Sequence, residues 1–132
     1  MPQPAARQGD PVVGTDTHIL LVPSPSGTTP TPMSLPFAGQ IASGTSTNVH
    51  INGQPAATAT SVAQNMPAHI PPPGTSFSKP PTNMGRVVSG SPTVLVNGKQ
   101  LARVNDPVMT CNDPADAPTS KITAGSPNVL VA

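Results

Sequence analysis

The sequence predicts an all-β domain in which three short β-hairpins surround a pseudo-threefold axis. Three observations lead to this prediction. Runs of β-branched and aliphatic residues, such as Thr93-Val94-Leu95-Val96, alternate with 20 Pro and 11 Gly in a chain of 132 residues. An Asn-Gly pair, the strongest short signal for a two-residue hairpin turn, follows two of these runs. The same short sequence also occurs three times. We expect residues 1–132 to form one compact, conical domain.

The repeat begins with Gly and ends with the predicted turn. Gly90-Ser-Pro-Thr-Val-Leu-Val-Asn-Gly98 recurs in looser form as residues 44–53 and in truncated form as residues 125–131. Type I′ turns need positive φ at both central residues, which favours hairpins at Asn52-Gly53 and Asn97-Gly98. The predicted register pairs Ile51 with Gln54, His50 with Pro55, Val96 with Lys99 and Leu95 with Gln100.

A second repeated sequence follows each turn. Pro4-Ala-Ala-Arg-Gln-Gly-Asp-Pro-Val12 at the N-terminus resembles Leu101-Ala-Arg-Val-Asn-Asp-Pro-Val108 after the second hairpin, and residues 55–57 begin the same way. The chain thus begins and ends halfway through a repeat. We expect residues 128–131 to pair with residues 4–7, so that the two termini complete the third hairpin and leave fewer free strand edges.

The segments between the repeats are rich in Pro, Gly, Ser and Thr. Residues 23–43 and 71–86 are predicted to be ordered surface loops, because Pro at positions 23, 25, 30, 32 and 36 forbids a helix. An apolar patch at residues 35–38 either anchors its loop to the core or belongs to a partner surface.

Composition excludes several classes of function. The net charge is +1 and the chain has no Glu, so nothing indicates binding to nucleic acid or to an anionic membrane. No signal-like leader and no apolar run of membrane-spanning length occurs, so we expect synthesis in the cytoplasm and no stable membrane insertion. Without Trp or Tyr the core is thin, and the single Cys111 excludes an internal disulfide. A metal or a partner is then needed for stability.

Three histidines and one cysteine are the candidate metal ligands. His18, His69 and Cys111 each follow the second strand of a different repeat, so threefold geometry would bring them together. His50 occupies the position of Leu95 and Leu130, which predicts an inward, apolar location on the same axis. Three imidazoles and one thiolate would form a closed tetrahedral site of the kind zinc prefers, with a structural role. The alternative is that all four are scattered polar residues.

Catalytic signals are weak. The sequence has no Gly-x-Ser-x-Gly elbow, and the Asp pair at equivalent repeat positions, Asp10 and Asp106, suggests turn capping or ion pairs with Arg7 and Arg103. A Ser-His-Asp set can be drawn with His18 and Asp10 or Asp16, but nothing singles out one Ser. We expect a protein that is not an enzyme.

These motifs resemble PAAR-repeat proteins: Pro4-Ala-Ala-Arg7 followed by Gly9-Asp-Pro11, and Gly90–Lys99 with Leu101-Ala-Arg103. The resemblance covers essentially the whole chain. It implies a sharp domain of short hairpins, with one structural Zn²⁺ per chain held by three His and one Cys. Carried over, these ligands are His18, His50, His69 and Cys111.

The resemblance also implies the function. Such proteins cap a trimeric, VgrG-like spike, one copy per trimer, in type VI secretion, contractile phage tails or extracellular injection particles. They help to puncture the target envelope, and effector proteins are additional expected partners. We expect assembly at the machine's tip and delivery out of the cell or into a target cell. The alternatives are a zinc-dependent hydrolase or toxin with an open coordination position, and an adhesive β protein without metal.

Overall fold

The structure is a computed structural model that describes residues 2–113 and 115–131. Within this part of the chain there is no helix, which confirms the all-β prediction, and therefore no helical segment that could cross a membrane. The strands are β1 (Gln3–Pro4), β2 (Pro11–Ser24), β3 (Gly27–Ser43), β4 (His50–Ile51), β5 (Gln54–Pro55), β6 (Val62–Asn65), β7 (Ser76–Phe77), β8 (Met84–Val87), β9 (Leu95–Val96), β10 (Lys99–Gln100), β11 (Pro107–Thr110), β12 (Ala117–Ile122) and β13 (Leu130–Val131).

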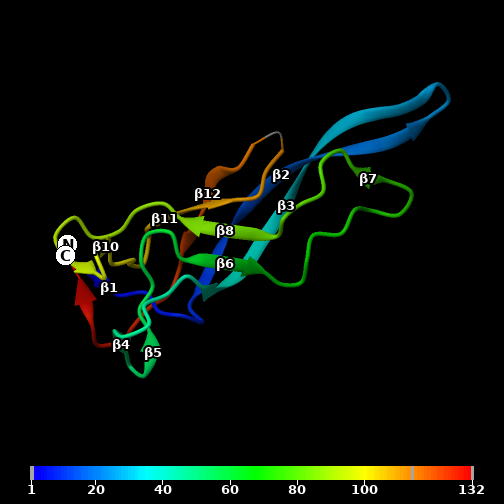
Figure 1. The fold of residues 1–132 in the computed structure, drawn as a ribbon. Helices are drawn as coiled ribbons and strands as arrows, with labels where there is room; N and C mark the ends of the chain where they lie inside the picture. Colours follow the sequence, from blue (N-terminus) through cyan, green and yellow to red (C-terminus); the bar gives the residue numbers. More distant parts are fainter. Residues whose placement is uncertain (1, 114, 132) are drawn as a thin grey trace.

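Three short hairpins form one end of the molecule, which we call the base: β4–β5, β9–β10 and β1–β13 (Figure 1). The predicted registers at both Asn-Gly turns are confirmed. Asn52 and Asn97 have φ of 53° and 52°, and the glycines after them are also positive, as type I′ turns require. The termini do pair, with Pro4 opposite Leu130, so the third hairpin is closed by the two ends of the chain.

A closed ring of hydrogen bonds lies on the pseudo-threefold axis above the base. Ala6 N–H donates to Ala102 O at 2.9 Å, Ala102 N–H to Ala57 O at 2.9 Å, and Ala57 N–H to Ala6 O at 3.0 Å. All three alanines have no exposed surface. A larger side chain would not fit at this axis, which explains why each repeat has Ala here.

The turn after each alanine is built in the same way in all three repeats. The Arg7 and Arg103 backbone N–H groups each donate to the Asp three residues later, at 2.7 Å, and their guanidinium groups pair with the same carboxylates. In the middle repeat Thr58 replaces Arg, and its N–H donates to Ser61 Oγ at 2.9 Å. The predicted task of the repeat Asp residues, an ion pair that holds a turn, is confirmed.

From these turns the chain continues into a closed sheet of six antiparallel strands, in the order β12, β11, β8, β6, β3, β2 and back to β12. Each repeat contributes one outgoing and one returning strand, so the sheet keeps the threefold pattern. Its interior holds the main core. Most residues of this core are small or β-branched: Ala6, Val12, Phe37, Ile41, Ala57, Ala63, Val87, Ala102, Val108 and Ile122.

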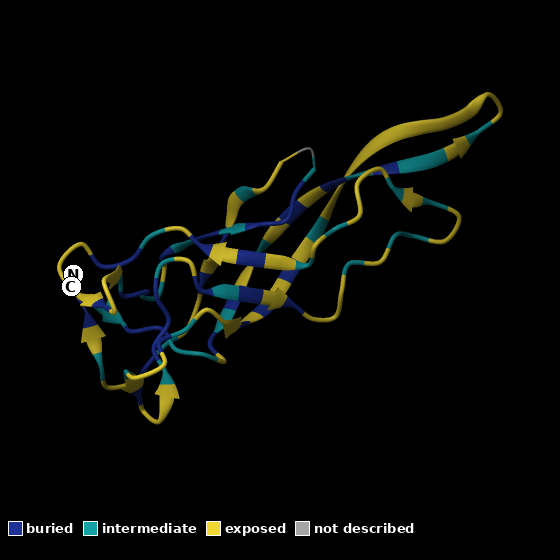
Figure 2. Cartoon of the chain, in the orientation of Figure 1, coloured by how far each residue is buried: buried dark blue, intermediate teal, exposed yellow. Residues whose placement is uncertain are grey.

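The prediction of loops at residues 23–43 was wrong. β2 and β3 form one long hairpin whose outer half, residues 19–36, extends beyond the closed sheet and is here called the arm (Figure 1). Most residues of the arm are exposed or half-buried (Figure 2). Proline excludes a helix, but it is compatible with a strand whose proline nitrogens face an open edge. The apolar patch at residues 35–38 does reach the core, because Phe37 is fully buried.

Candidate metal centre

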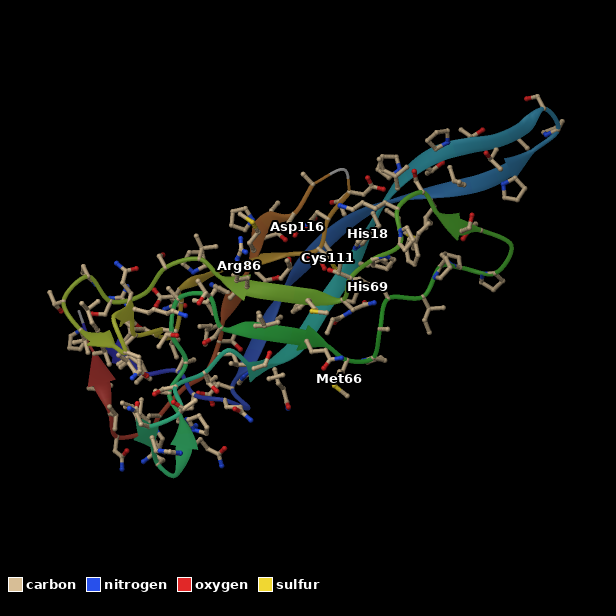
Figure 3. The ribbon with its side chains drawn as sticks, in the orientation of Figure 1. His18, Met66, His69, Arg86, Cys111 and Asp116 are labelled. Atoms are coloured by element: carbon tan, nitrogen blue, oxygen red, sulfur yellow. The ribbon has the colours of Figure 1, made fainter. Side chains whose placement is uncertain are left out.

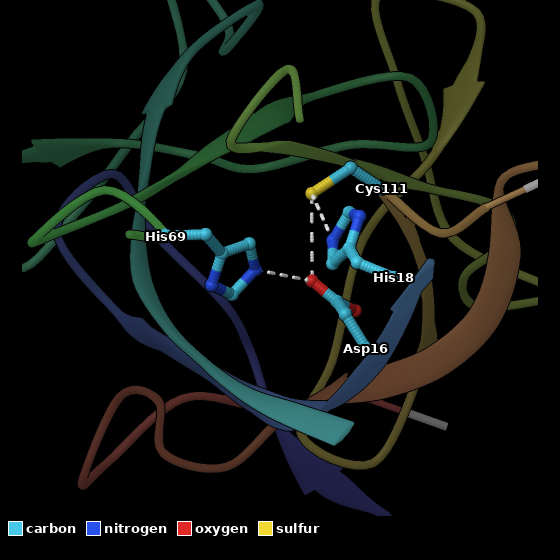
Figure 4. A group of neighbouring side chains, drawn as sticks. All are labelled: Asp16, His18, His69 and Cys111. Carbon is cyan, nitrogen blue, oxygen red and sulfur yellow. Dashed lines mark hydrogen bonds and ion pairs between the residues drawn. The ribbon is translucent and has the colours of Figure 1, made fainter. Parts of the chain in front are cut away.

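Four side chains converge inside the closed sheet where the arm begins: Asp16, His18, His69 and Cys111 (Figure 4). Their ligand-type atoms all lie within 4.8 Å of one another. Asp16 and His18 are two residues apart on β2, so both point to the same face of the strand. His69 follows β6 and Cys111 follows β11, which are the equivalent strands of the other two repeats. Figure 3 shows His18, His69 and Cys111 close together in the middle of the molecule.

Asp16 is at the centre of the cluster. Its Oδ2 accepts a hydrogen bond from His69 Nε2 at 2.9 Å and lies 3.4 Å from Cys111 Sγ. Cys111 Sγ is 3.8 Å from His18 Nε2. The side chains of Asp16 and His69 are 0% and 3% exposed, and His18 and Cys111 are buried to a similar degree. Donor atoms with this spacing and burial could coordinate one small cation.

Neighbouring side chains hold the cluster in place. The hydroxyl groups of Thr110 and Thr119 donate to Asp16 Oδ1, which leaves Oδ2 directed toward the other three residues. The backbone N–H of His69 donates to Asn83 Oδ1 at 2.7 Å, and Asn65 Nδ2 lies 3.3 Å from His69 Nδ1. Outer partners of this kind orient metal ligands in known sites.

Burial shifts the pKa values of two members of the cluster, His18 and Cys111. It lowers the pKa of His18 below the ordinary value of 6.5, and the adjacent His69 adds to the shift. Burial also raises the pKa of the Cys111 thiol above 9.0, with Asp16 acting in the same direction. Without a cation, the neutral imidazole and the neutral thiol are therefore favoured. A divalent cation would reverse the preference at the thiol, because it stabilises the thiolate directly.

The chemistry of these residues fits a metal. His18 Nδ1 is buried and has no hydrogen-bond partner among the described residues, and the nearest contact of its Nε2, to the thiol, is long. The nitrogen that faces the cluster is Nε2, and coordination there would give it a better partner than the thiol at 3.8 Å. Two imidazoles, one thiolate and one carboxylate are all donors that zinc accepts.

The structure does not bring His50 to this site. His50 lies on β4 in the base, it is exposed, and it does not belong to the cluster. Its repeat counterparts Leu95 and Leu130 are also exposed, by 62% and 61%. The next residue in each hairpin, such as Ile51 at 8%, faces inward instead. Because side chains alternate along a strand, an inward Ile51 requires an outward His50, so the predicted position of His50 was wrong.

Asp16 is the member of the cluster that the sequence analysis did not name as a candidate ligand. The signal was present, because Asp16 is two residues before His18 in a segment of extended character. The strand period places such a pair on one face, and a carboxylate there is a possible metal donor.

Comparison with known proteins gives one finding. A family model for the PAAR motif matches residues 78–132, which contain two of the repeated hairpin sequences and Cys111. No curated protein and no solved structure matches the chain significantly. The first half of the chain carries the same repeated turns, hairpins and central alanine as the matched segment. Residues 78–132 therefore carry the PAAR motif, a match that supports a PAAR-repeat protein.

Proposed function

We propose that this protein is the structural tip of a contractile injection system, where one copy caps a trimeric, VgrG-like spike. The PAAR motif is typical of spike-tip proteins of such machines. The observation that carries the proposal is the threefold base of a single chain: three equivalent hairpins joined by the ring of Ala6, Ala57 and Ala102. A monomer with this symmetry can make nearly equivalent contacts with all three chains of a trimer.

The surface of the base supports a role in docking. Leu95, Leu130 and His50 occupy equivalent outward positions, and the two leucines are large exposed apolar residues. The short strands of the base also leave backbone groups available to continue a β structure. A stable complex would bury on the order of 1,000 Å² or more in total.

One zinc ion, held by Asp16, His18, His69 and Cys111, would have a structural role. It would join strands from all three repeats at the point where the arm leaves the closed sheet. The four donors are almost completely buried, and the cavity beside His18 and Cys111 has a volume of about 10 Å³. A water molecule barely fits in a cavity of that size, so a polymeric substrate could not reach the ion.

Two measurements test the proposal. Elemental analysis of the purified protein should give about one zinc per chain. Co-purification with a trimeric VgrG-like spike should give one copy per trimer. Leu95→Asp together with Leu130→Asp should abolish that binding without loss of zinc. Val13→Asp, which changes an exposed apolar residue on the closed sheet, is the matched control and should bind normally. Normal binding by the double variant would show that the base is not the docking surface.

The proposed position at the tip of the spike implies how the protein is delivered out of the cell. A tip protein would leave the cell with the spike, and effector proteins would travel as separate partners of the spike complex. The zinc would help the end of the molecule opposite the base to remain folded while the spike is driven through the target envelope.

A further inference from the structure

Two buried side-chain atoms have no hydrogen-bond partner among residues 2–113 and 115–131: His18 Nδ1 and Asp113 Oδ2. They are complementary, because an imidazole nitrogen can carry a proton to donate and a carboxylate oxygen accepts one. Buried polar groups in proteins nearly always have a partner, so each exception needs an explanation. Two exceptions of opposite kind, beside the same candidate metal centre, indicate one shared explanation.

Asp113 lies beside His18 because the backbone holds it there. Asp113 N–H donates to Thr17 O at 2.8 Å, and Thr17 N–H donates to Asn112 Oδ1 at 2.7 Å. His18 is the next residue of β2 after Thr17. Burial lowers the pKa of His18, and the carboxylate of Asp113 acts against that shift, so the two side chains are within electrostatic reach of each other.

The cluster determines which nitrogen of His18 would bind a cation. His18 Nε2 faces Cys111 Sγ at 3.8 Å, inside the cluster (Figure 4). A neutral imidazole has one protonated and one unprotonated nitrogen, so a His18 that binds through Nε2 carries its proton on Nδ1. That N–H is then a buried donor, which is costly unless it finds an acceptor. Asp113 Oδ2 is a buried acceptor that lacks a donor.

We propose that Asp113 positions His18 for metal binding, by accepting a hydrogen bond from His18 Nδ1–H while Nε2 binds the cation. The inference rests on the metal centre of the proposed function and adds a residue outside the four-donor cluster. In the structure the two atoms do not form a hydrogen bond. Because the backbone on both sides is held by the contacts of Thr17, the bond forms by rotation of the side chains. A carboxylate behind a metal-binding imidazole fixes the orientation of the ring and raises its basicity.

The pairing predicts opposite effects of Asp113 with and without the cation. Without the cation, Asp113 Oδ2 stays a buried acceptor with no partner, which destabilises the folded state. With the cation bound, the same oxygen satisfies the Nδ1–H group of His18. A side chain that only stabilised its own segment would contribute equally in both states.

Zinc affinity of the full chain, measured by chelator competition, gives the first test. Asp113→Ala should weaken zinc binding about 10- to 100-fold, the usual effect of removing an outer partner of a metal ligand. In zinc-free buffer its urea-unfolding midpoint should be unchanged or higher, because a buried unpaired acceptor has been removed. Asp113→Asn keeps an acceptor oxygen and should bind zinc more tightly than Asp113→Ala. Asp116→Ala is the matched control: it removes an exposed carboxylate that lines the small cavity beside His18, and it should leave the affinity unchanged.

Nuclear magnetic resonance reports on the hydrogen bond itself. The chain has three histidines, so isotope-labelled histidine gives a simple spectrum of imidazole groups. In the zinc-loaded native protein, the His18 Nδ1–H proton should resonate far downfield and exchange slowly with water. In zinc-loaded Asp113→Ala it should move upfield and exchange faster.

Four results would overturn the inference. Asp113→Ala could bind zinc as tightly as the native protein, or it could lose the same stability with and without zinc. The Nδ1–H proton of His18 could be unchanged in Asp113→Ala. Asp113→Asn could bind zinc as weakly as Asp113→Ala, which would show that the charge matters and the acceptor does not. All four leave the metal centre standing if the native protein binds zinc, whereas a native protein without zinc would overturn the metal centre and this inference together.

Discussion

Replacing Asp16 by Asn tests the proposed metal centre most directly. The change keeps the size of the side chain, and the amide oxygen can still accept hydrogen bonds from Thr110 and Thr119, as Asp16 Oδ1 does now. What is lost is the anionic oxygen that lies between His69 and Cys111. The variant should therefore fold, and it should bind zinc more weakly.

The size of the effect can be worked out from the number of donors. Structural zinc sites with four ligands bind with about 10–16 kcal/mol, which is roughly 2.5–4 kcal/mol for each ligand. Losing one ligand then weakens binding by about 10²- to 10³-fold, at 1.4 kcal/mol for each factor of ten. At a fixed free zinc concentration far above both dissociation constants, the zinc-dependent part of the unfolding free energy should fall by about 2.7–4.1 kcal/mol.

Chelator competition measures the zinc affinity. Urea unfolding with and without zinc separates the zinc-dependent part of the unfolding free energy from the part that does not depend on zinc. Asp116→Asn is the matched control: this exposed Asp lines the same small cavity as His18 and Cys111 but does not belong to the cluster. It should leave zinc affinity unchanged. The reasoning is refuted if Asp16→Asn binds zinc as tightly as the native protein. It is equally refuted if the variant loses the same stability with and without zinc, because Asp16 would then be a purely structural hydrogen-bond acceptor.

Three further predictions concern stability and the base. Ser61→Ala should cost about 1–3 kcal/mol in urea unfolding, because the buried Thr58 N–H loses its acceptor; an unchanged midpoint would contradict this. His50→Ala should keep full zinc content in elemental analysis, whereas loss of zinc would place His50 at the metal after all. In the metal-free protein, stability should fall as the pH drops below 6.5, because the unfolded chain protonates His18 while burial resists this in the folded state. It should fall again above pH 9.0, where the unfolded chain loses the Cys111 proton that the folded state retains; unfolding curves of equal midpoint across both ranges would disprove the linkage.

The repeat made much of the fold predictable. Asn-Gly turns have a narrow choice of backbone geometry, so the registers at His50–Pro55 and Leu95–Gln100 followed from the sequence alone. The half-repeats at the two ends predicted the pairing of β1 with β13. The same logic predicted that His18, His69 and Cys111 would meet, because each follows the equivalent strand of its own repeat.

The predicted position of the fourth candidate ligand, His50, was wrong because residue type was taken as a guide to burial. His50 was expected to face inward because its counterparts are leucines, yet those leucines are exposed. In hairpins this short, the neighbouring Ile51, Val96 and Val131 are sufficient to fill the interior, and the alternate positions remain outside. An exposed leucine is common on a protein surface and does not predict an interior position.

The arm was missed for a different reason. Prolines at 30, 32 and 36 argue against a helix and against a central strand, and the remaining interpretation was a loop. The even-numbered spacing of these prolines was a signal for a strand that the sequence analysis did not use. A strand with one open edge can hold proline at every second residue, because those nitrogens make no bond to the neighbouring strand. Composition alone does not contain this information.

The ring formed by Ala6, Ala57 and Ala102 has a consequence for how the chain acquires its structure. Its members come from the beginning, the middle and the last third of the sequence, and the hairpin beneath it needs β13. During synthesis on the ribosome, the early segments therefore have no completed axis to attach to, and the final strand must emerge before the third hairpin can form. Folding of this protein should be slow and all-or-none, because most of its contacts join distant parts of the sequence.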